Sequence, residues 1–124
     1  MTPPKAHTVT PPSVIFVFGS NLAGYHGAGA ARDAVMYWEA RYYHGKGRQG
    51  YAYAIPTKDD KMQPLPLGAI ASYVRDFLQY ARTYPQLDFQ VTAIGCGLAG
   101  YRPEQIAPMF KNAPPNVHLP LGWK

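Results

Sequence analysis

Three glycines within six residues directly follow an apolar run in the second half of the chain, and this junction limits the possible folds more than any other feature. The run Val91-Thr92-Ala93-Ile94 is rich in β-branched residues, which predicts a buried strand. Gly95, Gly97 and Gly100 come next, and Pro103 stands where a helix could begin. Glycines at the carboxyl end of a buried strand leave backbone N–H groups uncovered and allow a ligand to approach closely. A strand, a glycine-rich loop and a helix start together predict an anion site, usually for phosphate.

A second stretch, near the amino end, repeats this arrangement. Residues 14–18 form a continuous apolar run, the pattern of a buried strand, and the segment 19–29 contains four glycines. Gly27 and Gly29 precede a predicted helix whose first N–H groups would face an anion, although close packing of that helix on the sheet would also require small residues. Two such loops at the same edge of one sheet could hold the two ends of a diphosphate.

Read in order, the apolar periodicity predicts an α/β chain in which strands alternate with helices. Residues 67–84 carry the clearest helical stripe, and Pro85 ends it. The expected elements are a strand at 14–18, a helix from 28 to about 43, a flexible turn at 45–50, a strand at 51–56, a loop at 56–66, a helix at 67–84, a strand at 89–95, a short helix from 103 and a strand at 116–120. This alternation favours a largely parallel sheet covered by helices.

Length and composition limit the chain to one globular domain. Its 124 residues are predicted to form an extended arm at 1–12, with a short edge strand at 7–10, and a single domain at 13–124. No apolar run reaches membrane-spanning length, and the first residues lack the apolar core of a signal peptide. The single cysteine excludes an intramolecular disulfide framework and fits a reducing compartment. We therefore expect a cytoplasmic protein with no membrane partner.

The charge balance favours an anionic partner. Twelve Lys and Arg against seven Asp and Glu leave a net charge of +5. Because the basic residues are scattered, with no Lys/Arg run and no arginine–aromatic repeat, one anionic ligand is a better interpretation than broad nucleic-acid binding. A basic nucleic-acid-binding domain is nevertheless a third hypothesis, and it predicts steep salt dependence. Four scattered histidines and one cysteine do not give metal-ligand spacing, so no metal is expected.

Three segments resemble the ligand-binding motifs of macrodomains, and they occur along the chain in the same order as in that family. Phe18-Gly19-Ser20-Asn21 with the alanine-rich stretch 24–31 is similar to the first ligand loop of that family, and 94–101 looks like its second phosphate loop. Residues 53–58 resemble the strand and catalytic-lysine loop of the lysine-using ADP-ribosyl hydrolases, a group that includes glycohydrolase antitoxins acting on ADP-ribosylated DNA. The likeness covers most of residues 13–120 and extends to small stand-alone macrodomain-like proteins of bacteria and phages.

This resemblance implies a three-layer α/β/α macrodomain-like fold with a largely parallel or mixed sheet. It also implies that ADP-ribose, or an ADP-ribosyl group on DNA or protein, binds across the two glycine loops without a metal or cofactor. The matching ligand-binding positions are Gly19, Ser20, Asn21, His26, Gly27, Gly29, Gly95, Cys96, Gly97, Leu98, Ala99, Gly100 and Tyr101. Lys58 and Asp59 are the candidate catalytic residues.

The second loop departs from the pattern of the lysine-using hydrolases, which carry an aspartate at the position where this chain has Ala99. Lys58 could attack the anomeric carbon of the sugar or hold a phosphate, or it is a solvated lysine in a polar loop. Asp59 could supply the missing acid or base, or belong to an ordinary polar turn. The chain is thus predicted to be an ADP-ribosyl glycohydrolase, which Lys58 favours, or a non-catalytic reader, which Ala99 favours.

Four further residues each have two interpretations. Asn21 could hydrogen-bond a ribose hydroxyl, as the matching family residue does, or form an Asx turn. Cys96 lacks an accompanying His-and-acid pattern, so a structural role is favoured over a nucleophile. His26 could contact a phosphate or lie on the surface. Tyr101 could stack on the sugar or pack under the last helix.

Overall fold

A five-stranded sheet with β1 at its centre organises the computed structural model, which describes residues 13–123. The predicted arm at 1–12 lies outside the described residues. The strands are β1 (Val14–Asn21), β2 (Gly47–Gln49), β3 (Ala52–Lys58), β4 (Asp88–Val91) and β5 (Val117–His118), in the order β2-β3-β1-β4-β5. β1 pairs in parallel with β3 and β4, and β4 with β5, whereas β2 runs antiparallel to β3. The predicted α/β class with a largely parallel or mixed sheet is confirmed.

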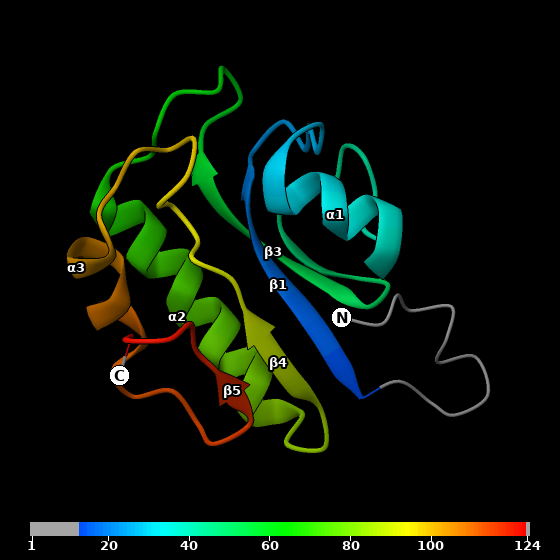
Figure 1. Cartoon of the computed structure of the whole chain (residues 1–124), viewed down its shortest axis with the longest axis vertical. Helices are drawn as coiled ribbons and strands as arrows, with labels where there is room; N and C mark the ends of the chain where they lie inside the picture. Colours follow the sequence, from blue (N-terminus) through cyan, green and yellow to red (C-terminus); the bar gives the residue numbers. More distant parts are fainter. Residues whose placement is uncertain (1–12, 124) are drawn as a thin grey trace.

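Helices cover both faces of this sheet, which gives three layers (Figure 1). The helix α1 (Gly29–Trp38) lies on one face. On the other face lie α2 (Leu67–Thr83) and the short α3 (Pro103–Ile106), which continues as the 3-10 turn η2 (Ala107–Phe110). The predicted stripe of α2 is confirmed, because its buried residues Ile70, Val74, Phe77, Leu78 and Ala81 face the sheet. No helix within residues 13–123 combines the length and apolar character needed to cross a membrane.

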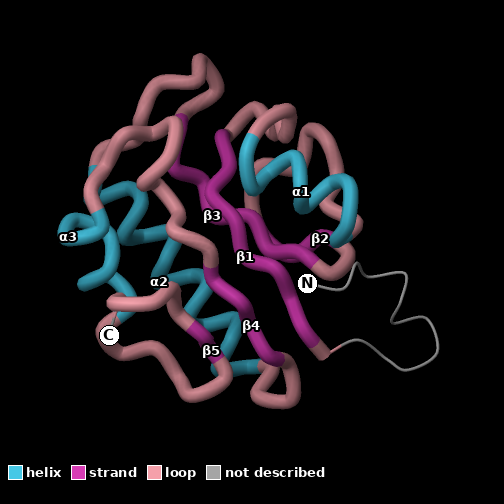
Figure 2. The backbone as a smooth tube through the Cα atoms, in the orientation of Figure 1, coloured by secondary structure: helices cyan, strands magenta, loops and turns pink. Residues whose placement is uncertain are grey.

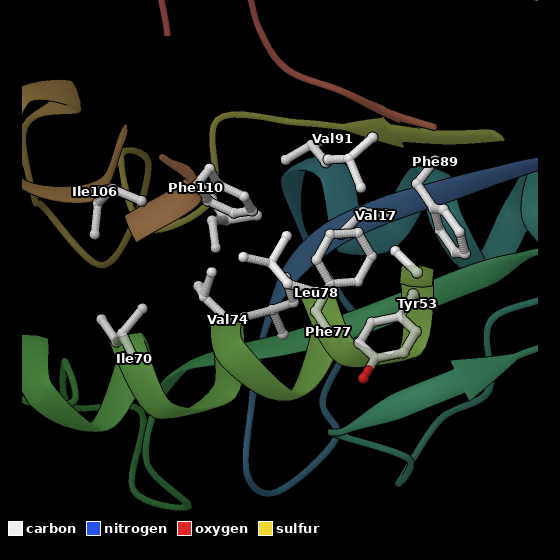
Figure 3. Close-up of a cluster of buried hydrophobic side chains, with 14 of the residues drawn as sticks. Val17, Tyr53, Ile70, Val74, Phe77, Leu78, Phe89, Val91, Ile106 and Phe110 are labelled. Atoms are coloured by element: carbon white, nitrogen blue, oxygen red, sulfur yellow. The ribbon is translucent and has the colours of Figure 1, made fainter. Parts of the chain in front are cut away.

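The larger core lies between the sheet and α2 (Figure 3). Phe77 of α2 is fully buried, and its ring packs edge-on against Tyr53 of β3 and Phe89 of β4, with centroids 5.0 and 5.3 Å apart. Phe110 of η2 closes the same cluster from the side. Burial of each such ring removes apolar surface from water and contributes on the order of 2–3 kcal/mol. This core holds in place the sheet whose strands β1 and β4 lead into the two glycine loops.

Two predicted segments differ from the observed elements on the α1 side of the sheet. The first helix ends at Trp38 rather than near Tyr43, because Glu39 adopts a left-handed φ of 65° and its N–H turns back to the carbonyl of Ala34. The segment 45–50 is not a flexible turn, since it contains β2, which forms the edge of the sheet beside β3 (Figure 2). Its glycines and charged residues hide a strand signal, as is common at exposed sheet edges.

Strand ends also differ from the predicted ones near the glycine loops. β1 continues to Asn21 instead of stopping at Phe18, and β4 ends at Val91 instead of residue 95. β3 runs through Pro56 to Lys58, where the sequence predicts a loop. Pro56 fits because β2 pairs only as far as Ala54, so the side of β3 that faces away from β1 is an open edge there. Lys58 therefore sits on a strand end with a fixed backbone.

Candidate active site

A cavity of about 660 Å³ lies at the carboxyl ends of the central strands. It is enclosed by the ends of β1 and β3, the start of α1 and the loop that follows β4, which Figure 1 shows at the same end of the sheet. Its lining residues are Gly19, Ser20, Asn21, Tyr25, Gly27, Ala28, Gly29, Ala30, Ala31, Thr57, Lys58, Met62, Thr92, Ala93, Ile94, Gly95, Cys96, Gly97, Leu98 and Ala99. The two glycine loops thus meet at one site, as predicted, and its volume is in the range of small-molecule pockets.

The start of α1 forms one wall of the cavity and is suited to an anion. Ala28, Gly29 and Ala30 line the wall, and no side chain caps the helix start. Its first turn carries no acidic residue. The first amide N–H groups of a helix have no partner within the helix, so here they are available to a ligand and add the positive end of the helix dipole.

The second glycine loop forms the opposite wall with its backbone. Gly95 and Gly100 have φ values of 74° and 84°, so their own turn geometry already requires glycine. Gly97 does not have a positive φ, and a Cβ added to it would meet no atom within 4 Å. The fold therefore does not require glycine at Gly97. Glycine at this position leaves open space beside the backbone of the cavity wall.

The predicted contribution of a helix start to this second wall is wrong. The first turn of α3 carries Glu104, and the Arg102 N–H at its start donates to Oε1 of Gln105 at 2.9 Å. Residues 102–106 do not line the cavity. The second loop can therefore bind an anion only through its own amides, whereas the first loop combines amides with the start of a ten-residue helix.

Lys58 is the only charged residue among the described residues that line the cavity. It lies across from Asn21 in the β1–β3 pairing, and its carbonyl accepts the Leu22 N–H at 3.0 Å, which fixes the backbone next to the first loop. Within residues 13–123 no carboxylate forms an ion pair with its amine. The lining formed by residues 13–123 therefore has one cationic residue, half-buried, between the start of α1 and the second glycine loop.

Asp59 follows Lys58 but does not line the cavity. Its Oδ1 accepts the backbone N–H groups of Lys61 and Gln63 at 2.8 and 2.9 Å. These hydrogen bonds favour the second interpretation of Asp59, an ordinary polar turn, because its carboxylate holds the loop between β3 and α2. The described lining contains no carboxylate.

The side chains at the end of β1 serve the protein's own backbone. The Asn21 amide donates to the carbonyl of Tyr25 at 2.8 Å and accepts the Tyr25 N–H at 2.9 Å, which clamps the first loop as an Asx-type turn does. The Ser20 hydroxyl donates to the carbonyl of Gly45, and Thr57 donates to the carbonyl of Ser20 at 3.2 Å. All three side chains are buried. Their positions in the cavity lining expose mainly backbone to a ligand.

His26 lies beneath the first loop and does not line the cavity. The surface alternative is wrong, because only 1% of the residue is exposed. Its Nε2 donates to the carbonyl of His44 at 3.0 Å, while Nδ1 is buried without a hydrogen-bond partner. Burial lowers the pKa of His26 below its usual 6.5, so the imidazole is held neutral. The ring packs edge-on against Phe18 and anchors the loop to the segment 41–45.

Gln49 of β2 completes this anchor, although nothing in the sequence indicated a role for it. It is buried, its Nε2 donates to the same His44 carbonyl at 2.8 Å, and its Oε1 accepts the Arg41 N–H at 2.8 Å. Its burial follows from its place in β2, and the sequence does not predict that strand because glycines flank it. Buried polar groups that satisfy one another in this way hold a loop in one conformation.

The remaining predicted residues divide between the cavity and its support. Cys96, Leu98 and Ala99 line the cavity, whereas Gly100 and Tyr101 do not. Burial, together with Glu104, raises the pKa of the Cys96 thiol, which keeps it protonated and supports its structural interpretation. The Tyr101 hydroxyl donates to the Leu65 carbonyl at 2.5 Å, so Tyr101 ties the second loop to the start of α2.

Several lining residues were not predicted, and all of them are uncharged. Tyr25 and Met62 come from the two loops beside Lys58, and Thr92 lies just after β4, where its hydroxyl donates to the Val17 carbonyl at 2.8 Å. Tyr25 could have been suspected, because an aromatic residue between glycines has few reasons to be there. Among residues 13–123 no group of three or more His, Cys, Asp or Glu is placed to hold a metal ion.

No protein-family model matches the sequence, and no curated protein matches it. The structure, however, is similar to the macrodomain of Mycobacterium tuberculosis DarG, with a TM-score of 0.67 and 20% sequence identity over 87% of this chain and 86% of that one. It is also similar to a protein of unknown function from Bacteroides thetaiotaomicron, with a TM-score of 0.62 and 13% identity over 96% and 94% of the two chains.

A further similar structure is that of Thermosipho africanus DarTG in complex with ADP-ribose. The TM-score is 0.58 and the identity 17%, over 90% of this chain and 39% of that longer protein. At such identities the similarity concerns the fold, and the chain has the three-layer macrodomain fold that its motifs predicted.

Proposed function

We propose that this protein binds ADP-ribose, or an ADP-ribosyl group carried by DNA or protein, in the cavity between its two glycine loops. The observation that carries the proposal is a pair of backbone walls, the uncapped start of α1 and the loop around Gly97, with Lys58 as the one cation among the described residues of the lining. Two anion-binding walls match a diphosphate, and the cavity of about 660 Å³ leaves room for its sugars. The presence of ADP-ribose in a structure of the same fold adds support.

The first test measures binding of ADP-ribose by calorimetry, with AMP and NAD for comparison. A Gly97→Glu variant should abolish ADP-ribose binding, because it fills the ligand space and brings a like charge to the phosphates. Its fold should be retained, since the new side chain meets no atom within 4 Å at Cβ. Gly68→Glu is the matched control: Gly68 also has open space, lies in α2 and is outside the cavity lining. Normal ADP-ribose binding by folded Gly97→Glu would remove the second loop from the site.

A second, finer proposal is hydrolysis, and the position of Lys58 in the cavity favours it. A neutral lysine amine can attack the anomeric carbon while the bond to the modified group breaks and the electron pair leaves with that group. Water would then release ADP-ribose and free the lysine. Lys58→Ala should abolish release of ADP-ribose from modified DNA or protein and change ADP-ribose affinity by only about tenfold, roughly 1.4 kcal/mol.

Lys61→Ala serves as the control for the release assay, because Lys61 lies in the same loop, is exposed and does not line the cavity. Release that persists in Lys58→Ala would exclude Lys58 from the mechanism. The alternative function is a non-catalytic reader, and two observations favour it: Ala99 occupies the lining where the lysine-using hydrolases carry an aspartate, and the described lining contains no carboxylate. Tight ADP-ribose binding with no release from any substrate would establish the reader.

A further inference from the structure

Three tyrosines, Tyr25, Tyr42 and Tyr43, form an exposed aromatic cluster beside the cavity. Their exposed fractions are 51%, 46% and 75%. Tyr43 packs edge-on against Tyr25 and against Tyr42, with ring centroids 6.1 and 6.0 Å apart. Single exposed aromatic rings are common, but a contiguous group of them costs solubility and marks a binding surface.

The backbone holds this tyrosine cluster in place at some cost. Tyr43 has a left-handed φ of 68°, which is rare for a large side chain and typical of functional segments. Its N–H donates to the Gly24 carbonyl at 2.8 Å, and a Cβ on Gly24 would collide with the Tyr43 backbone at 2.4 Å. The Asn21 amide clamps Tyr25 from the other side. The rings are therefore preorganised before any ligand arrives.

The tyrosine cluster continues the cavity wall. Tyr25 belongs both to the cluster and to the cavity lining. The Tyr42 hydroxyl lies 3.3 Å from the position of a Cβ on Gly27, which also lines the cavity. A group that projects from a bound nucleotide past Tyr25 would thus meet aromatic rings instead of water.

The stretch of chain that contains Tyr42 and Tyr43 has no acidic residue from position 40 to position 58. Arg41 precedes the two tyrosines and is exposed. Lys46 and Arg48 follow them, but their side chains reach Tyr73 and Tyr80 of α2. Aromatic rings with basic neighbours bind nucleobases joined to phosphates, because each base stacks on a ring while the charges attract its phosphate. The scattered distribution of charge in the whole sequence conceals this local bias.

We infer that the tyrosine cluster is an exterior subsite that stacks a nucleobase attached to the group bound in the cavity. The inference rests on the proposed function, which places a nucleotide beside Tyr25, and it extends the ligand beyond ADP-ribose itself. The base can belong to a dinucleotide or to a neighbouring nucleotide of a single strand. Both sources present the same planar ring and adjoining phosphate.

The experiment compares three probes on the folded protein: ADP-ribose, NAD and a single-stranded tetranucleotide that contains 2-aminopurine, whose fluorescence falls on stacking. Tyr43→Ala should lower the affinity for NAD or for the tetranucleotide about tenfold. The affinity for ADP-ribose should not change, since Tyr43 is outside the cavity lining. Tyr43→Phe should retain the affinity because it keeps the ring. Tyr37→Ala is the control, because Tyr37 is similarly exposed at 43% but lies on α1.

The probe that responds to Tyr43→Ala identifies the source of the base. Equal loss of ADP-ribose affinity would overturn the inference, because the ring would then support the loop or contact ADP-ribose itself instead of stacking an additional base. Unchanged affinity for both NAD and the tetranucleotide in Tyr43→Ala and in Tyr25→Leu would also overturn it. Absence of ADP-ribose binding by the wild type would contradict the proposed function separately, and the 2-aminopurine signal would still decide whether the tyrosines stack a base.

Discussion

Different kinds of side chain cover the two faces of the central sheet. On the α2 face, β1 and β3 contribute Ile15, Val17, Tyr53 and Ile55 to a core of large aliphatic and aromatic residues. On the α1 face, five of the seven buried apolar residues are alanines: Ala31, Ala34, Ala40, Ala52 and Ala54. Alternate residues of one strand thus serve two purposes, because the side-chain period of a strand is two.

Polar groups replace large apolar ones toward the cavity end of the α1 face. Ser20, His26 and Gln49 are buried there, and their hydrogen bonds converge on the backbone of residues 41–45. Hydrogen bonds contribute modest net stability, about 1 kcal/mol each, but they fix geometry. From this comparison we expect the α2 face to supply most of the stability and the α1 face to hold the first wall of the cavity in shape.

The largest expected effect is on the α2 face. Phe77→Ala should lower the free energy of unfolding by about 3–5 kcal/mol, because it leaves a cavity among Tyr53, Phe89 and Phe110. Urea unfolding followed by circular dichroism measures this. The affinity of the remaining folded protein for ADP-ribose should not change. A loss below 1 kcal/mol would contradict the division of roles between the two faces.

A smaller effect, confined to the α1 face, should depend on pH. Because burial lowers the pKa of His26 in the folded state, the unfolded chain binds the proton more readily below about pH 6.5. Stability should therefore be complete above pH 6.5 and fall as the pH decreases, by at most about 1.4 kcal/mol per pH unit.

Urea midpoints at pH 7.5, 6.5 and 5.5 test this, with His26→Gln as the reference, because glutamine can still donate to the His44 carbonyl but does not titrate. The difference between the two proteins should grow toward acid pH. If the two curves stay parallel, then protonation of His26 is not coupled to folding, and the α1 face is no more sensitive to acid than the rest of the molecule.

The smallest effect is expected at Cys96, which lines the cavity and packs partly against the α2-side core. Cys96→Ala should leave ADP-ribose binding and any hydrolysis nearly unchanged, since its thiol is kept protonated. Calorimetry and the release assay measure the two quantities. A thousandfold fall in turnover, the order expected for loss of a covalent nucleophile, would make Cys96 part of the chemistry instead of the wall.

Features that depend on local order along the chain could be predicted from the sequence. Strand–glycine junctions predicted the two loops, and the apolar stripe predicted a helix at 67–84, which matches α2 to within one residue of its end. Both signals are local: a strand end needs glycine where the backbone turns or meets a ligand, and a helix on a sheet needs one apolar face. The apolar run before Lys58 likewise predicted its place near both loops, and the structure has it in the cavity lining at the end of β3.

The burial of polar residues and the exposure of aromatic ones could not be predicted, because they depend on contacts between elements that are distant in the sequence. His26 and Gln49 are far apart in the sequence and look like surface residues, but they meet at one carbonyl because β2 folds back along β3. Tyr43 looks like the continuation of a helix, yet the left-handed turn at Glu39 ends α1 and directs the chain to Gly24. Periodicity describes a residue's neighbours along one element, whereas burial of a polar group depends on partners that other elements bring to it.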